Sequence, residues 1–193
     1  GDLHNTKITD IGIDKDGYVW LVGRDGVSFF QSPSLIFEGG EDNDAVKPIF
    51  DGRPLLEEEF ISAIAIDGGN RKWLGSDNGL WLMDPTGTEV ILNFNTDNSP
   101  LPTNKINDIE INQETGEVFF ATDLGLVSYR GDATLGNNDC KDEIKVFPNP
   151  VEPNYTGNVG ITGLTTNSEI KITDTWGNLI FETTANGGAA SWN

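Results

Sequence analysis

Three segments of the chain repeat one pattern of apolar residues and glycines, and this repeat limits the possible folds more than any other feature. Each segment begins with spaced isoleucines, passes through a turn rich in Asp, Asn and Gly, and reaches an aromatic residue that a glycine follows six positions later. The segments occupy residues 8–27, 61–80 and 106–126, so the third is one residue longer. Their starts lie 53 and 45 residues apart, close to the roughly 40 to 50 residues that one blade of a β-propeller needs.

Each segment is predicted to form three antiparallel strands joined by tight turns. Ile64 and Ile66 alternate with small residues, which is typical of a half-buried strand. Residues 14–17 and 67–70 supply Asp, Asn and Gly, which tolerate the positive φ angles of hairpin turns. Residues 89–94 predict a fourth, outer strand after the second segment, and four strands make a blade. The third segment has Phe119 and Phe120 in place of the tryptophan, and no alternating run follows it.

The pattern predicts an all-β protein whose first part is a partial β-propeller. A closed propeller has roughly four to eight blades, so we expect residues 1–132 to be the last three blades of a larger ring. The two uncovered flanks of such a fragment predict edge-mediated self-association.

The remainder of the chain has a different character. Residues 133–143 are expected to be a linker. Residues 144–193 contain short alternating runs at 159–161, 169–173 and 179–183, which predict a small Ig-like β-sandwich. About 50 residues is short for that fold, which normally has ~100, so we expect the sandwich to be truncated.

Both parts resemble known families. The isoleucine strand, Asp/Gly turn, tryptophan strand and Gly-Leu turn of residues 8–132 resemble the two-component regulator propeller repeat. Phe-Pro-Asn-Pro at 147–150, Ile-Thr-Gly-Leu at 161–164, Lys-Ile-Thr-Asp at 171–174, Gly-Asn-Leu at 177–179 and Gly-Gly at 187–188 before Trp192 resemble the carboxy-terminal sorting domain of type IX secretion cargo in Bacteroidetes-type bacteria. A propeller joined directly to such a domain is similar to a surface component of that secretion system.

The resemblance implies a non-catalytic component or accessory of the type IX secretion and attachment system, at the extracellular face of the outer membrane. Its propeller would be a platform that binds sortase or other secretion components, or an anionic glycan such as lipopolysaccharide. The same repeats occur in the periplasmic, glycan-sensing portions of hybrid two-component regulators, which gives the alternative interpretation.

The composition excludes several classes of function. A net charge of −19 and a pI of about 4.1 oppose binding to nucleic acid, which needs a basic surface. No apolar run approaches the roughly 20 residues of a membrane-spanning helix. His4 is the only histidine and Cys140 the only cysteine, so no nucleophile and base can be assembled into a catalytic triad. We therefore expect no enzyme activity, no catalytic residue and no cofactor.

Few residues are candidates for ligand binding. Trp176 lies at the tip of a predicted hairpin and is the best aromatic contact. Arg71 and Lys72 are the only adjacent cations in an acidic chain and could meet an anionic ligand, although a solvated surface pair is the simpler interpretation.

Calcium is the one metal that the sequence suggests. Asp42 and Asp44 lie in an acidic stretch that offers hard oxygen ligands, but the spacing does not fit an EF-hand and a plain loop is the simpler interpretation. The repeated tryptophans could stack sugars, yet their shared register favours packing between neighbouring blades, which is the role we expect for Trp20, Trp73 and Trp81.

Overall fold

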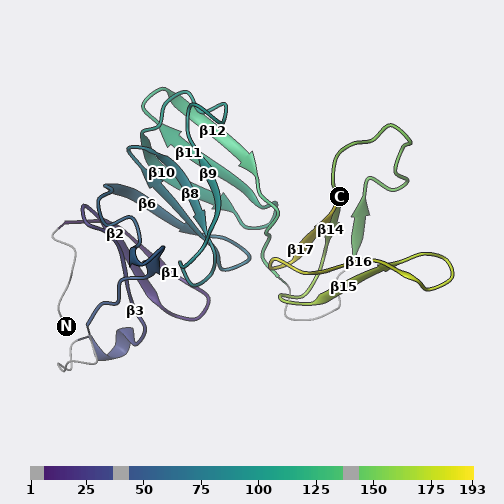
Figure 1. The fold of residues 1–193 in the computed structure, drawn as a ribbon, viewed down its shortest axis with the longest axis horizontal. Coiled ribbons are helices and arrows are strands. Elements are labelled where there is room, and N and C mark those ends of the chain that lie inside the picture. The colour runs from purple at the N-terminus through teal and green to yellow at the C-terminus, as the bar shows by residue number, and fades with distance from the viewer. Residues whose placement is uncertain (1–6, 37–43, 137–143) are drawn as a thin grey trace. The chain divides into compact units, whose positions relative to one another are not determined.

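The computed structural model describes residues 7–36, 44–136 and 144–193 and is an all-β structure (Figure 1). Within these ranges the one helical element is a short 3-10 helix, η1 (Pro33–Leu35). No helix in the described part of the chain is long and apolar enough to cross a membrane. The all-β fold class predicted from the sequence is confirmed.

The chain divides into two compact units. The first contains the residues up to Ile66 together with Asn70–Ile111 and Val118–Tyr129. The second contains Asp67–Gly69, Asn112–Glu117 and Arg130–Asn193.

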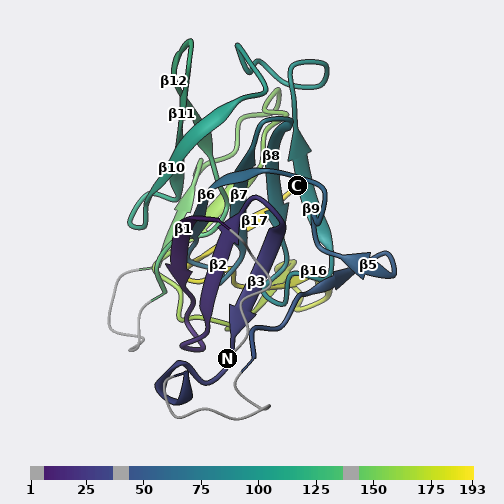
Figure 2. The same ribbon diagram turned by 90° about the vertical axis from the view of Figure 1, so that its left-hand side faces the viewer.

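Three small sheets in the first unit follow the three repeated segments (Figures 1 and 2). The first sheet consists of β1 (Ile8–Ile13), β2 (Val19–Gly23) and β3 (Gly26–Phe30). The second consists of β6 (Ile61–Ile66), β7 (Lys72–Ser76), β8 (Gly79–Met83) and β9 (Val90–Phe94). The third consists of β10 (Ile106–Asn112), β11 (Glu117–Thr122) and β12 (Gly125–Arg130). A two-stranded hairpin precedes the second sheet and contains β4 (Ile49–Phe50) and β5 (Arg53–Pro54).

The repeated glycines set the second turn of each sheet. Strands β3, β8 and β12 begin at Gly26, Gly79 and Gly125, whose φ angles are +82°, +123° and +130°. Glycine adopts this region without the steric cost that a side chain brings. At Gly79 an added Cβ would also lie 2.2 Å from the carbonyl oxygen of Phe94. The predicted hairpin turns are therefore confirmed at the predicted glycines.

Large aromatic side chains pack between the sheets. Trp20 is buried in the apolar cluster that joins the first and second sheets, against which Trp81 is partly buried. Trp73 is buried in the cluster that joins the second and third sheets, with its ring centroid 5.7 Å from that of Phe120. The predicted packing role of these tryptophans is confirmed. In the third repeat Phe119, the counterpart of Trp73 counted from the turn glycine, is only partly buried, because no further sheet of the described chain covers that face. Phe120, the counterpart of Leu74, is buried in the cluster between the second and third sheets.

The three sheets differ at their outer edges. The fourth strand predicted at residues 89–94 is present as β9, paired antiparallel with β8. In the first sheet, the corresponding partner of β3 is a single bridge in which Phe29 and Val46 exchange two backbone hydrogen bonds of 2.8 Å. In the third sheet β12 is the edge strand, and the described residues after it add no fourth strand, as predicted.

The second unit contains a three-stranded sheet and a separate hairpin. The sheet has the order β13 (Lys145–Phe147), β14 (Val159–Thr162) and β17 (Ala189–Trp192), and the hairpin pairs β15 (Glu169–Thr173) with β16 (Leu179–Thr184). Its small apolar cluster is formed by Ile161, Leu164, Ala185 and Ala190.

Candidate functional site

The adjacent cations Arg71 and Lys72 are buried, so the expectation of a solvated surface pair is wrong. Arg71 is 6% exposed and Lys72 is 0% exposed. Lys72 begins β7, and its ammonium Nζ lies 3.0 Å from Oδ2 of Asp14 in the turn of the first sheet. An acidic residue one repeat earlier thus supplies the counter-charge, and Lys72 has no exposed surface to offer an anionic ligand.

The carboxylate of Asp14 is held by donors on both oxygens. Oδ2 accepts a 2.8 Å hydrogen bond from the indole Nε1 of Trp20, and Oδ1 accepts backbone N–H groups of Asp16 and Tyr18 at 3.0 and 2.9 Å. Burial alone would raise the pKa of Asp14, but these donors and Lys72 outweigh it and hold the pKa below its ordinary value of 3.8.

The ammonium of Lys72 has fewer compensating partners. It donates to the backbone carbonyl oxygens of Asn70, at 2.8 Å, and Pro85, and lies 4.7 Å from the ring centroid of Trp20. Burial lowers the pKa of Lys72 below 10.5 by more than the attraction of Asp14 raises it. The cluster therefore joins the first and second sheets, and its role is structural.

Trp176 is the most exposed aromatic side chain among the candidates, with 86% of its surface accessible. It lies in the turn between β15 and β16, where Asp174 accepts backbone N–H bonds of 2.9 Å from Trp176 and Asn178. The side-chain hydrogen bond from Asn178, followed by these backbone bonds, lowers the pKa of Asp174 and fixes the turn. Ligand contact by Trp176 stays a prediction.

The proposed calcium ligands are only partly described. Asp42 lies outside the described residues, as do His4 and Cys140, while Asp44 is exposed. Within the described ranges no three His, Cys, Asp or Glu side chains come together as a metal site. Calcium binding at Asp42 and Asp44 stays a prediction.

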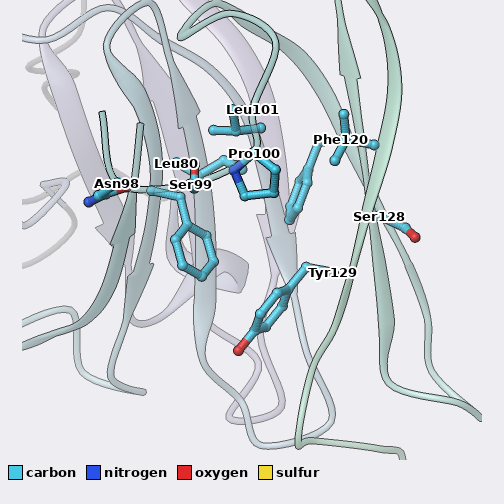
Figure 3. A pocket seen from close by; sticks show the side chains of 10 residues that line it. Leu80, Asn98, Ser99, Pro100, Leu101, Phe120, Ser128 and Tyr129 are labelled. Atoms are coloured by element: carbon cyan, nitrogen blue, oxygen red, sulfur yellow. The ribbon is translucent and has the colours of Figure 1, made fainter. Parts of the chain in front are cut away.

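An apolar pocket lies between the second and third sheets of the first unit (Figure 3). It has a volume of about 170 Å³. Figure 3 shows Leu80, Pro100 and Leu101 on one side of it and Phe120 and Tyr129 on the other. The full lining is Leu80, Phe94, Asn98, Ser99, Pro100, Leu101, Phe120, Val127, Ser128 and Tyr129.

The pocket offers mainly apolar and aromatic contacts. The ring of Tyr129 lies 5.1 Å from that of Phe94 and 5.8 Å from that of Trp73. The polar groups at the rim are engaged within the chain, since Asn98 Nδ2 donates to the carbonyl oxygen of Asn93 at 2.9 Å and Ser99 Oγ donates to that of Asn95. Sequence reasoning missed this pocket. The available signal was the lack of a fourth strand after Tyr129, which leaves this side of β12 uncovered.

Comparisons with known proteins give structural relatives but no family assignment. No protein-family model matches the sequence, and no curated protein matches it. PorZ from Porphyromonas gingivalis, described as an essential bacterial surface component of the type IX secretion system, is similar over 100% of this chain, with 26% identity and a TM-score of 0.70. A structure described as the extracellular domain of a hybrid two-component system, BT4673 of B. thetaiotaomicron, is similar over 93% of the chain, with 14% identity and a TM-score of 0.51. The chain spans 26% of the PorZ structure and 24% of the BT4673 structure.

Proposed function

We propose that the chain is part of a non-catalytic surface component or accessory of the type IX secretion and attachment system. The observation that supports this most is the similarity to PorZ, which extends over the whole chain at 26% identity. The similarity to the BT4673 domain, at 14% identity, supports the fold alone. Placement at the extracellular face of the outer membrane is part of the same proposal.

In this proposal the three sheets are blades of a larger β-propeller. Equivalent positions of the repeat support it, because they are buried wherever a neighbouring sheet is present. Val27 and Leu80, each directly after the turn glycine, are 1% exposed, whereas Leu126 at the same position of the last sheet is 70% exposed. On the opposite flank, Ile64 and Ile109 are buried, but Ile11 is 58% exposed. Both outer flanks thus have the apolar character of an interface between blades.

The second unit would be the region that the secretion machinery recognises, as an Ig-like sorting domain. Its strands β13, β14 and β17, together with β15 of the hairpin, line an open apolar groove that includes Val146, Ile161, Ile172 and Trp192. The propeller would be the platform for secretion components or an anionic glycan such as lipopolysaccharide. Because residues 1–139 carry 9 basic and 25 acidic residues, such a glycan would have to meet a local cationic patch or bridging cations.

A periplasmic, glycan-sensing portion of a hybrid two-component regulator is the second candidate. The resemblance of residues 8–132 to the propeller repeat of such regulators favours it, and the BT4673 extracellular domain has a similar fold. The two candidates differ in which side of the outer membrane the protein faces.

Protease treatment of intact cells distinguishes the two locations. A surface component is cleaved in intact cells, whereas a periplasmic sensor is cleaved only after the outer membrane is permeabilised. Deletion of the complete gene then tests the role in secretion: cargo proteins with sorting domains should remain unprocessed and detached until the gene is restored. Normal processing and attachment of cargo in the deletion strain would refute the proposal.

A further inference from the structure

The outer edge of the third sheet is the one place where the repeat leaves a strand position empty in the described part of the chain. In the second sheet β9 pairs with β8, and in the first sheet Val46 bridges Phe29 of β3. The equivalent strand β12 is an edge strand. Its backbone N–H and C=O groups on that side can therefore pair with an added strand.

The register of the second sheet indicates where such a strand would place its side chains. Counted from the turn glycines Gly79 and Gly125, Tyr129 is the counterpart of Met83. In the second sheet Met83 is paired with Val90, whose side chain packs into the apolar cluster between the first two sheets. A residue opposite Tyr129 would enter the corresponding space between the second and third sheets.

That space is the pocket of Figure 3. Tyr129, Val127 and Phe94 line it, and about 170 Å³ is open. An apolar cavity of about 150 Å³ is known to hold a benzene molecule. The pocket therefore has room for an aromatic ring or a large aliphatic side chain, with the rings of Phe94 and Tyr129 available for edge or offset contacts.

We propose that β12 and this pocket form a site for β-strand addition by a partner polypeptide. The partner segment is extended, pairs antiparallel with β12, and inserts one aromatic or large aliphatic side chain opposite Tyr129. Backbone hydrogen bonds supply affinity and the pocket supplies specificity, as in other complexes of this type. Since the chain has a net charge of −19, basic residues flanking the apolar segment favour association. The proposal does not depend on the secretion function.

The chain's own β9 supplies a probe, because β9 already occupies the equivalent position on β8. A synthetic peptide of residues 88–95 with two added lysines is titrated into the isotope-labelled protein and followed by amide chemical shifts. We expect shifts centred on Val127 to Tyr129, with binding at least about fivefold tighter for a Val90→Phe peptide and at least tenfold weaker for a Val90→Asp peptide.

Two protein variants test the pocket itself. Val127→Phe fills the pocket from within and should weaken binding of the Val90→Phe peptide at least tenfold. Leu126→Phe adds the same ring on the opposite, exposed face of β12 and should leave binding within about twofold.

Three results would overturn the proposal: equal affinity for the Val90→Phe and Val90→Asp peptides, unchanged binding by Val127→Phe, or shifts that map away from β12. A dimer formed through β12 without any peptide would also overturn it, because a second copy would then be the occupant. Pairing of β12 with a strand from another part of a longer chain that contains these residues would overturn it in the same way. The peptide series alone decides the question if Val127→Phe does not fold.

Discussion

Replacing Lys72 by methionine isolates the charge of the buried cluster between the first and second sheets. Methionine has a similar length and volume, so the change creates little cavity. It leaves Asp14 as a carboxylate whose side chain is 1% exposed and has lost its counter-charge. Breaking a buried ion pair in this way costs about 3–5 kcal/mol. Asp14 keeps its bonds from Trp20 and two backbone N–H groups, so we expect about 3 kcal/mol, at the low end of that range.

Urea unfolding measures this loss, with Lys105→Met as the matched control. Lys105 forms an ion pair of 2.9 Å with Asp123, but the two side chains are 53% and 50% exposed. An exposed pair contributes about 0–1 kcal/mol, so the control should barely change the unfolding free energy. For Lys72→Met the melting temperature should fall by about 6–12 °C. Equal losses of unfolding free energy for Lys72→Met and Lys105→Met would refute the argument that burial makes the Lys72–Asp14 pair the more important one.

The same variant changes the acid sensitivity of the fold. The pKa of Asp14 is lowered in the folded protein, so its stabilisation is present above 3.8 and is lost as the pH falls through the folded pKa. Without Lys72 the pKa of Asp14 rises, and acid unfolding of the variant should begin at a higher pH than in the wild type. The pKa of Lys72 is also lowered, from 10.5, so in the wild type stability rises with pH between the folded pKa and 10.5. That alkaline gain should be absent from Lys72→Met.

Three further substitutions test other parts of the structure. In thermal unfolding, Gly79→Ala should destabilise the protein more than Gly125→Ala. Both positions have a positive φ, which costs about 1–3 kcal/mol for a residue with a side chain. Only at Gly79 would the added Cβ also clash with a backbone atom, the carbonyl oxygen of Phe94 at 2.2 Å. Ile13→Lys, at a 69% exposed position of the outer flank, should reduce concentration-dependent self-association in light scattering, and a wild-type chain that is monomeric at all concentrations would contradict this. Trp176→Ala should change stability by no more than about 0.5 kcal/mol and remove the tryptophan most accessible to acrylamide quenching.

The regular parts of the fold follow from short-range features of the sequence. Ile8, Ile61 and Ile106 are the first residues of β1, β6 and β10. The next two isoleucines of each repeat are two residues apart, which is the strand period. A register shift after Ile8 and after Ile61 accommodates the spacing of three residues before them. The turn glycines could be placed because a hairpin needs a positive φ that few other residues adopt. Trp20 and Trp73 could be assigned to the core because they occupy the same register in successive repeats.

The burial of Lys72 could not be predicted in the same way. Its solvation depends on Asp14, which lies 58 residues earlier in the chain and reaches it only through the packing of two sheets. A pattern read along one strand contains no information on such a partner. The partial exposure of Phe119 has a similar origin, because the burial of this position depends on a neighbouring sheet and not on the pattern along its own strand.

The third sheet combines two departures from the repeat, and together they make it the favoured place for interactions. Thr9 donates its hydroxyl to the carbonyl oxygen of Ile61, and Ser62 donates to that of Ile106, so each of the first two sheets is linked to the next by the same position. The third residue of this series, Asn107, instead donates to Asp123 at 2.8 Å within its own sheet. In a repeat protein equivalent interfaces stabilise one another, and a terminal repeat exposes the groups that its predecessors bury. In the described chain the third sheet has both an exposed flank and an edge strand, β12. We therefore expect a partner to bind the third sheet in preference to the first two.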